Sequence, residues 1–257
     1  MISVIIPTYK TPEALDLCLR SAIKGQKEVN EINVIVDGTY EINKNVLSKH
    51  IKNIRPIVLS NNVGMSIAQN IGVSKSKHDN ILIVNDDNVF PDQWDTELIK
   101  HDCKNKVITP NQIEPYPSIF NQFIIKDLGR DPKTFDLQAF WIYEKKQKHN
   151  VINHQGSTYP IYMKRLQYLA CGGFDIEYPT KTGTYTDWDF FLKCELNRLI
   201  MERIYSIHFY HFVSVTRKND EDLIREKNIE NECYKWFINK WGKKPNHNPL
   251  NNSKIFN

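Results

Sequence analysis

Short apolar strands alternate with helical segments through the first half of this chain, and that alternation restricts the fold more than any other feature of the sequence. Strand and helix in regular succession form right-handed crossovers, which place the strands parallel in one sheet with helices on its faces. We therefore expect an α/β fold with a mostly parallel sheet flanked by helices. The predicted strands are 3–6, 32–36, 57–59 and 81–84, and the predicted helices are 12–25, 42–54 and 65–74.

Thr11 is expected to cap the first of these helices, with Pro12 at its first position. The second half of the chain is less regular. Its clearest elements are a helix at 187–196, an aromatic-rich strand at 204–215 and a long amphipathic helix at 220–241, which forms a C-terminal helical extension. The charged run at 144–149 is expected to be a solvated surface segment and not a nucleic-acid site.

The strand at 81–84 leads directly into Asn85-Asp86-Asp87-Asn88. Residues at the end of such a strand reach the crevice where open α/β sheets bind ligands. Adjacent carboxylates repel each other, and their oxygens suit Mg²⁺ or Mn²⁺, which commonly bridge to a phosphate. The alternative is an acidic turn that caps a following helix, with Pro91 at its first position.

Two other strand ends carry polar groups that suit a nucleotide. The first strand runs into Pro7-Thr8-Tyr9, which offers a hydroxyl and an aromatic ring, and the second runs into Asp37-Gly38, which also suits a simple turn. A third segment, from Asn61 to Gly72, opens a helix with amide side chains and glycine, a composition that capping and close packing also explain.

Composition narrows the setting. The chain has 257 residues, a formal net charge of +4 and five scattered cysteines without a C-x-x-C pair. This favours one large domain with reduced thiols in the cytoplasm, and argues against a zinc site. No signal peptide and no apolar run of membrane-spanning length is expected. The mild basic excess is compatible with phosphate-bearing small molecules or with peripheral contact to a membrane.

Taken together, these segments resemble the family 2 glycosyltransferases, which have the GT-A fold. The matching pieces are Ser3 to Tyr9, Val36-Asp37-Gly38-Thr39, Asn62-Val63-Gly64, Asn70-Ile71-Gly72, Asn85-Asp86-Asp87-Asn88, Gly172-Gly173-Phe174-Asp175 and Thr186-Asp187-Trp188-Asp189. Their order and their placement after strands carry the resemblance, which covers roughly 1–214.

The resemblance implies a role for each of these positions. Asp187 corresponds to the catalytic base, Asp87 to a ligand of Mn²⁺ or Mg²⁺, and His211 to a further metal ligand. The nucleotide-binding positions are Pro7, Thr8, Tyr9, Asp37, Asn62, Gly64, Asn70 and Asp86. The positions expected to face the sugar or acceptor are Gly172, Gly173, Trp188 and Asp189. The implied division is a nucleotide-sugar-binding half at 1–110, an acceptor-binding half at 111–215, and a helix and tail at 216–257.

Three departures from the family pattern leave alternatives open. Val36 precedes Asp37 where a second aspartate is common, Asn85 stands at the first acidic position of the metal motif, and Thr186 replaces the usual glutamate before the base. Asp189 is therefore a rival base, and His208 competes with His211 as a metal ligand.

The implied activity is metal-dependent, inverting transfer of a hexose or N-acetylhexosamine from a UDP-sugar to a glycan, lipid-linked or protein-linked acceptor. A cation offsets the charge of the leaving diphosphate, and a carboxylate takes the proton of the acceptor hydroxyl. A catalytically inactive nucleotide- or glycan-binding domain remains an alternative. A nucleotidyltransferase on a related sheet is a third, although Pro7-Thr8-Tyr9-Lys10 is not a glycine-rich phosphate loop. Oligomeric state is not indicated.

Overall fold

The computed structural model describes residues 1–117, 122–153, 158–213 and 220–245. Its strands are β1 (Ile2–Thr8), β2 (Glu31–Asp37), β3 (Arg55–Leu59), β4 (Asn80–Ile83), β5 (Asn88–Val89), β6 (Lys106–Glu114), β7 (Ile124–Ile125), β8 (Ile152–Asn153), β9 (Ile161–Lys164) and β10 (Ile200–His211). Its helices are α1 (Pro12–Gly25), α2 (Tyr40–His50), α3 (Met65–Lys75), α4 (Trp94–Ile99), α5 (Leu137–Gln147), α6 (Arg165–Ala170), α7 (Thr186–Leu196) and α8 (Asp220–Trp241).

A single sheet organises the molecule, with strand order β3-β2-β1-β4-β9-β6-β10-β5 and with β7 and β8 joined to β6 and β10. The pairs β1–β2, β2–β3 and β1–β4 are parallel, and so is β6–β10. The strand β9 runs antiparallel to both of its neighbours, β4 and β6. The α/β class and the mostly parallel sheet predicted from the sequence are thus confirmed, with a reversed strand at its centre.

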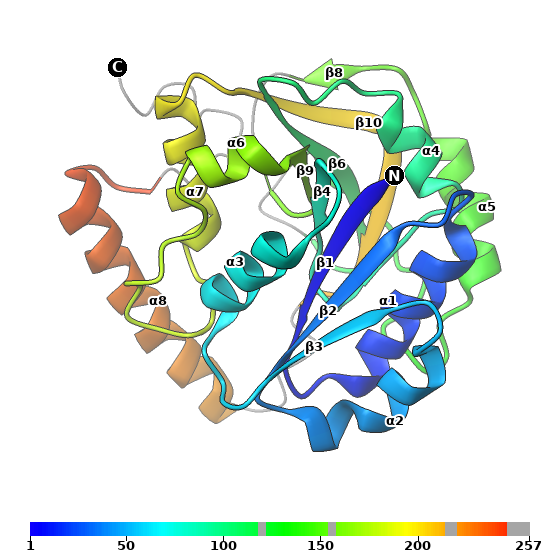
Figure 1. The fold of residues 1–257 in the computed structure, drawn as a ribbon, viewed down its shortest axis with the longest axis horizontal. Helices are drawn as coiled ribbons and strands as arrows, with labels where there is room; N and C mark the ends of the chain where they lie inside the picture. Colours follow the sequence, from blue (N-terminus) through cyan, green and yellow to red (C-terminus); the bar gives the residue numbers. More distant parts are fainter. Residues whose placement is uncertain (118–121, 154–157, 214–219, 246–257) are drawn as a thin grey trace.

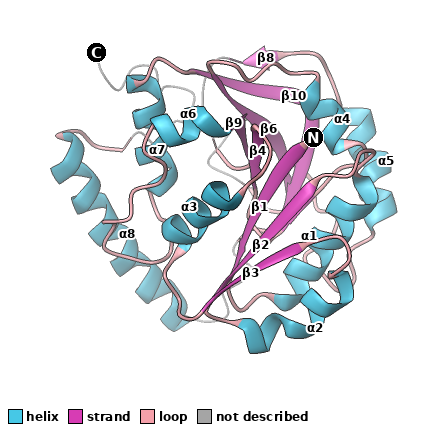
Figure 2. Ribbon diagram, viewed as in Figure 1, coloured by secondary structure: helices cyan, strands magenta, loops and turns pink. Residues whose placement is uncertain are grey.

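Helices cover both faces of this sheet (Figures 1 and 2). One face carries α1, α2, α4 and α5, and the other carries α3, α6 and α7, with α8 outermost beside α7 (Figure 1). A core on the first face includes Leu15, Trp94 and Phe209, and a second core on the other face includes Ala68, Phe174 and Phe190. The helix α3 approaches the sheet closely at Gly72, where an added Cβ would lie 2.4 Å from Cγ2 of Ile5.

Most predicted elements are present with shifted ends. The helix at 220–241 matches α8, and the helix at 187–196 begins one residue earlier. The strand predicted at 204–215 is β10, which begins at Ile200 and ends at His211; residues 214 and 215 lie outside the described part. Within the described residues, no helix combines the length and the apolar character that a membrane span requires.

One alternative and one expectation from the sequence are wrong. The helix after the acidic turn begins at Trp94, so Pro91 is not its first residue and Asp86 and Asp87 do not cap it. The charged run at 144–149 is not wholly solvated either, because Glu144 is only 1% exposed. One Oε1 atom of Glu144 accepts the backbone N–H of His208 at 3.0 Å, which fixes the end of α5 to β10.

Candidate functional site

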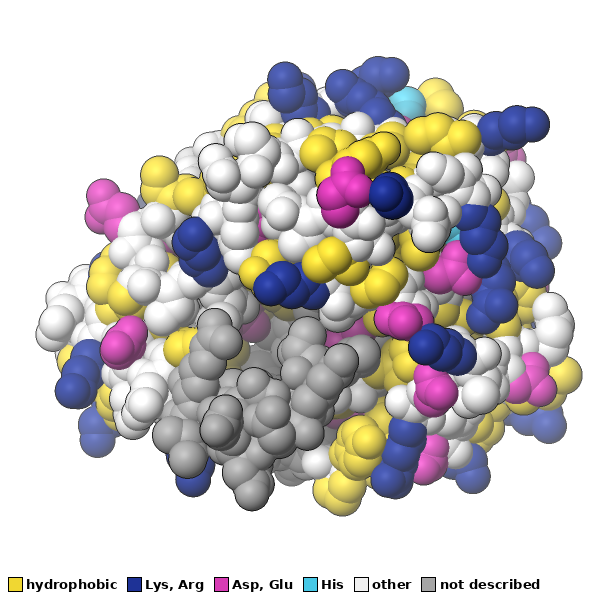
Figure 3. Space-filling model, turned by 90° about the horizontal axis from the view of Figure 1, so that it is seen from below, with side chains coloured by type: hydrophobic (Ala, Val, Ile, Leu, Met, Phe, Trp, Pro, Cys, Tyr) yellow, Lys and Arg dark blue, Asp and Glu magenta, His cyan; other side chains and the backbone are white. Residues whose placement is uncertain are grey.

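The carboxyl ends of β1, β2 and β4 meet at one edge of the sheet, because the three strands are parallel neighbours. This brings Thr8, Asp37 and Asp86 to the same side of the molecule, as ligand crevices of α/β sheets require. Figure 3 looks toward that edge, where basic and acidic side chains are interspersed. The visible surface therefore carries no large field of one sign of the kind that a nucleic-acid partner needs.

A pocket of about 540 Å³ lies at the ends of β1, β2 and β3. Its size falls within the range of small-ligand sites. Tyr9 is 41% exposed there, and Nζ of Lys10 lies 5.0 Å from the centre of its ring. A hydrogen bond to Asn62 is the main cause that lowers the pKa of Tyr9. The pocket is lined by Tyr9, Lys10, Gly38, Thr39, Tyr40, Glu41, Ile42, Val58, Leu59, Ser60 and Asn62.

Asp37 holds the loop that leads into α3. Its Oδ1 accepts the N–H of Val63 at 2.7 Å and its Oδ2 accepts the N–H of Gly64 at 2.9 Å. Gly64 has a φ of 93°, and a Cβ there would lie 2.9 Å from Cα of Lys181. Each oxygen of Asp37 has a further lone pair, so the expected contact with a uracil N–H stays a prediction beside this backbone role.

Asp86 sits at the end of β4 against the start of α1. Burial and the neighbouring charge of Asp87 raise its pKa to about 7, although hydrogen bonds from Thr11 and Thr8 oppose the shift. The hydroxyl of Thr11 donates to Oδ2 of Asp86 at 2.5 Å and makes no cap bond to its helix. Thr11 was expected as the cap of this helix, and its side chain instead ties α1 to the acidic strand end.

Asp87, His211 and Glu114 form a chain of charges. Nε2 of His211 lies 3.5 Å from Oδ2 of Asp87, and its Nδ1 lies 2.9 Å from Oε1 of Glu114. Burial opposes a charge on the imidazole, but the two carboxylates outweigh it and raise the pKa of His211 to about 10. Glu114 is the last residue of β6, and the polar segment Thr109 to Gln112 precedes it, so no apolar run in the sequence indicated its place at the site. His208 is fully buried beside Glu144 and does not belong to the group formed by Asp87, His211 and Glu114.

Part of this arrangement fits a divalent cation. Oδ1 of Asp87 and the side-chain oxygen of Asn85 are buried and accept no hydrogen bond from any described residue. A buried carboxylate oxygen without a donor is unfavourable unless a cation faces it. In the described part of the chain no three His, Cys, Asp or Glu side chains converge as a ready metal site. Asp87 is therefore the residue that fits a metal best, whereas His211 would first have to lose its proton.

Asn70 joins α3 to the glycine loop after α6. Its Nδ2 donates to the carbonyl of Phe174 at 2.8 Å, and its Oδ1 accepts the N–H of Phe174 at 2.9 Å and the hydroxyl of Tyr168 at 2.6 Å. Gly173 has a φ of 62°, and a Cβ there would lie 2.6 Å from Oδ1 of Asn70. Asn70 was expected to contact the nucleotide, and here its amide is engaged by groups of α6 and of the glycine loop.

Asp187 occupies the first turn of α7 and is partly exposed. The preceding Tyr185 has a left-handed backbone, with φ of 62°, and the hydroxyl of Thr186 donates to the carbonyl of Gly183 at 2.6 Å. These contacts fix the turn from which Asp187 projects. Burial raises the pKa of Asp187 to about 6, while hydrogen bonds from the backbone N–H groups of Trp188 and Asp187 oppose the shift.

Asp189 and Trp188 face α8. Asp189 is fully buried, with Nζ of Lys240 2.5 Å and Nε1 of Trp241 2.8 Å from its Oδ1. Trp188 is 8% exposed and packs in a cluster with Phe237 of α8. Trp188 and Asp189 were expected to line the acceptor site, and these contacts make both of them part of the packing between α7 and α8.

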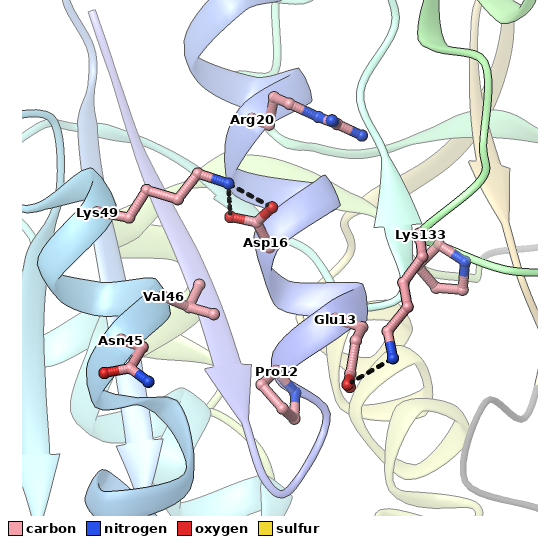
Figure 4. Close-up of a pocket in the computed structure, with 9 residues that line it drawn as sticks. Pro12, Glu13, Asp16, Arg20, Asn45, Val46, Lys49 and Lys133 are labelled. Atoms are coloured by element: carbon pink, nitrogen blue, oxygen red, sulfur yellow. Dashed lines mark hydrogen bonds and ion pairs between the residues drawn. The ribbon is translucent and has the colours of Figure 1, made fainter.

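A second pocket, of about 340 Å³, lies between α1 and α2 (Figure 4). Its cations are largely paired inside it. Nζ of Lys49 lies 2.7 Å from Oδ2 of Asp16, and Nζ of Lys133 lies 3.2 Å from Oε1 of Glu13 (Figure 4). Since these charges neutralise each other, the pocket at the ends of β1, β2 and β3 suits a nucleotide better.

Several solved structures share this fold. One is S. aureus TarS 1-349 in complex with UDP, with a TM-score of 0.57 and 14% identity over 94% of this chain and 72% of that one. Another is the mannosyltransferase PcManGT from Pyrobaculum calidifontis in complex with GDP-Man and Mn²⁺, with a TM-score of 0.59 and 15% identity over 99% of this chain and 67% of that one. A longer S. aureus TarS chain has a TM-score of 0.56 and 17% identity over 83% of this chain, which spans 37% of its length.

Comparison with curated proteins finds no match. At these identities the solved structures establish the fold alone. The sequence model of glycosyl transferase family 2, however, matches residues 3–166, which is more than half of the chain and includes β1 to β4, the pocket and the acidic strand end. The chain therefore belongs to glycosyl transferase family 2 and is a glycosyltransferase.

Proposed function

We propose that this glycosyltransferase moves a hexose or N-acetylhexosamine from a UDP-sugar to a glycan, lipid-linked or protein-linked acceptor, with inversion at the anomeric carbon and with the help of Mn²⁺ or Mg²⁺. The observation that carries the proposal is the buried Oδ1 of Asp87, which accepts no hydrogen bond from any described residue. The neighbouring Asp86 accepts a hydrogen bond from the backbone of Tyr9, which lines the pocket of nucleotide size. A carboxylate oxygen in that position suits a cation that is itself bound to a diphosphate.

The donor side follows from the pocket at the ends of β1, β2 and β3. Tyr9 offers an exposed ring for the base, and Asp37 keeps the adjacent loop in place while retaining lone pairs that can accept a uracil N–H. The solved relatives bind both kinds of nucleotide sugar, UDP-GlcNAc in TarS and GDP-Man in PcManGT. We favour UDP because a carboxylate suits the N–H of uracil, and Asp86 would lie near the ribose.

A divalent ion would be held by Asp87, and would offset the negative charge that develops on the leaving diphosphate. His211 is the second residue within reach of such an ion. It now pairs with Asp87 and Glu114, and it would have to release a proton before its imidazole could bind the ion. Asp86, whose pKa is raised to about 7, is held by Thr11 and shapes the same strand end.

Asp187 is the proposed base. A raised pKa of about 6 makes it a better proton acceptor than an ordinary aspartate while leaving it ionised near neutral pH. Its rival Asp189 is fully buried and held by Lys240 and Trp241, so it is poorly placed to reach an acceptor hydroxyl. Thr186, in place of an acidic residue, supports the turn through its bond to Gly183.

The cell compartment and the limits of the two halves belong to the same proposal. All five cysteines are buried free thiols, which fits a reducing cytoplasm. The strand β6 (Lys106–Glu114) crosses residue 110, so a donor half at 1–110 and an acceptor half at 111–215 would be two functions of one sheet, with 216–257 as an addition.

The test is a melting-temperature screen with UDP, GDP and Mn²⁺, followed by assays of UDP release from UDP-glucose, UDP-galactose and UDP-N-acetylglucosamine. UDP with Mn²⁺ should stabilise the protein far more than either alone; a ligand at about 100 times its Kd adds roughly 2.7 kcal/mol. An equal shift with GDP would remove the uracil argument. Binding without UDP release from any donor would favour an inactive binding domain.

A further inference from the structure

The C-terminal end of α8 reaches both acceptor-side motifs of this chain. Nζ of Lys240 donates to Oδ2 of Asp175, the last residue of the glycine loop, and lies 2.5 Å from Oδ1 of Asp189 in α7. Nε1 of Trp241 donates to the same oxygen of Asp189 at 2.8 Å. One lysine thus connects two segments whose rings also pack together, with the centres of Phe174 and Phe190 4.8 Å apart.

A second lysine completes the network from inside α7. Nζ of Lys193 lies 3.5 Å from Oδ2 of Asp189 and donates to the carbonyl of Gly173. The buried carboxylate of Asp189 therefore faces a cation at each oxygen, and each of these cations also holds the glycine loop. Breaking a buried ion pair leaves an uncompensated charge, which strongly disfavours the original geometry.

The arrangement is built into a packed interface and is not a chance surface contact. Lys240 lies over the rings of Trp236 and Trp241, at 5.0 and 5.2 Å from their centres. Its side chain is 27% exposed, whereas that of Asp189 is fully buried. Below it, Phe237 and Cys233 of α8 pack on Trp188 and Leu192 of α7. The aromatic rings and the apolar contacts fix where the ammonium group lies.

We propose that Lys240, assisted by Trp241, is a positioning residue that locks the first turn of α7 against the glycine loop 172–175, and so fixes Asp187 relative to the acceptor. The proposal rests on the assignment of Asp187 as the base. Asp187 lies in the same helical turn as Asp189, so a shift in the position of Asp189 moves the proposed base as well. A displacement of about 1 Å at a reacting group can lower the rate about 100-fold.

The residues that carry this role lie outside the part of the chain that the family model matches. The family match ends at residue 166, before the glycine loop, α7 and α8. The C-terminal helix would thus be a working part of the acceptor side, although α8 itself supplies no atom to the reaction. Lys240 acts through Asp189 and Asp175, which distinguishes it from a catalytic residue.

The test compares full-length Lys240→Met with Lys240→Arg and with Lys235→Met, which removes an exposed lysine on the same helix. UDP release from the UDP-sugar that the wild type uses gives kcat and KM, and hydrogen exchange reports on 172–175 and 186–189. For Lys240→Met we expect kcat to fall about 10- to 100-fold with the donor KM unchanged, and faster exchange in both segments. Lys240→Arg should recover most of the loss, and Lys235→Met should match the wild type.

A compensating variant separates positioning from general stability. In Lys240→Met/Asp189→Asn the fully buried carboxylate is removed together with its cation, so exchange in 186–189 should return toward the wild-type rate. Unchanged kcat and exchange in Lys240→Met would overturn the proposal, as would a loss that Lys240→Arg and the double variant fail to reduce. If the wild type releases no UDP from any donor, the proposed function fails, and the exchange measurements alone still decide whether Lys240 locks the two segments.

Discussion

Asp187 and Asp189 show how two identical side chains in one helical turn acquire different properties. Asp187 is partly exposed, but the loss of solvent around its carboxyl group raises its pKa to about 6, and no cation is among the groups that oppose this shift. Asp189 points to the other side of α7, where Lys240 and Lys193 approach its two oxygens. The difference arises from what packs on each side of the helix, so it is a property of the fold and not of the local sequence.

Replacing Asp187 by Asn removes the proposed base while keeping the shape of the side chain. We expect turnover to fall about 10²–10⁴-fold, the usual effect of losing a general base. Because a base must be ionised, kcat/KM of the wild type should rise with pH up to about 6 and then level off. Rate profiles of UDP release check both points, with the exposed Asp131→Asn as control. Full activity with the same pH profile in Asp187→Asn would exclude this role.

The same replacement should stabilise the fold at neutral pH. The pKa of Asp187 is higher in the folded chain, about 6, than the ordinary value near 3.8, so the folded state binds the proton more tightly. Its stabilising effect is present below pH ~4 and is lost as the pH rises through about 6. At pH 7.5, Asp187→Asn should be more stable than the wild type by about 1–3 kcal/mol in urea unfolding. Equal or lower stability would show that the ionised carboxylate is well solvated.

Asp87→Ala tests the cation site. It removes the oxygen that has no hydrogen-bond partner in the described residues, together with one partner of His211. We expect UDP alone to shift the melting temperature as in the wild type, and the additional shift with Mn²⁺ to disappear. Asp92→Ala, at a partly exposed aspartate that pairs with Lys27, is the control. A retained Mn²⁺ effect in Asp87→Ala would place the metal elsewhere.

At the scale of elements, local sequence patterns predicted the strands and helices whose formation depends on residues close together in the chain. The strands β1, β2 and β4 and the helices α7 and α8 follow from apolar runs and amphipathic periods. Contacts across long separations did not follow. The pairing of His211 with Glu114 joins residues 97 apart, and the bond from Thr11 to Asp86 joins residues 75 apart. Sequence patterns show that such groups end a strand or begin a helix, but not which distant group each one meets.

The contact between α3 and the glycine loop gives a prediction at this scale. Asn70→Leu removes three hydrogen bonds, to both backbone groups of Phe174 and to Tyr168. Each buried polar group left without a partner costs about 1–3 kcal/mol, so we expect a loss of roughly 2–4 kcal/mol in urea unfolding. Asn231→Leu, at an exposed position of α8, should change stability by less than about 0.5 kcal/mol. A loss below about 1 kcal/mol in Asn70→Leu would mean that the loop is held by its other contacts.

At the scale of the whole molecule, one sheet carries both parts of the proposed reaction. The parallel strands β1, β2 and β4 end at the nucleotide pocket and the acidic turn. The reversed strand β9 leads into α6 and the glycine loop, which Asn70 fastens to α3. The pocket at the ends of β1, β2 and β3 and the glycine loop are therefore attached to one framework, made of the sheet and α3.

The stereochemical outcome tests this arrangement as a whole. Single displacement needs one base and no nucleophile, and three carboxylates near the acceptor half are otherwise engaged or exposed. Oδ2 of Asp127 lies 2.7 Å from Nε of Arg130, Oδ1 of Asp131 accepts the backbone N–H of Lys133 at 2.9 Å, and Glu177 is exposed. Among the described residues, we thus assign no nucleophile for a covalent glycosyl intermediate.

The acceptor should then enter opposite the departing diphosphate, so that an α-linked donor gives a β-linked product. Proton NMR of the first-formed product measures this through the coupling constant of its anomeric proton. The sugar released from the same donor by water, sampled before mutarotation, serves as the internal control and should also be β. An α-linked product would mean either a double displacement or front-face attack, and in both cases Asp187 would no longer be the residue that sets the direction of attack.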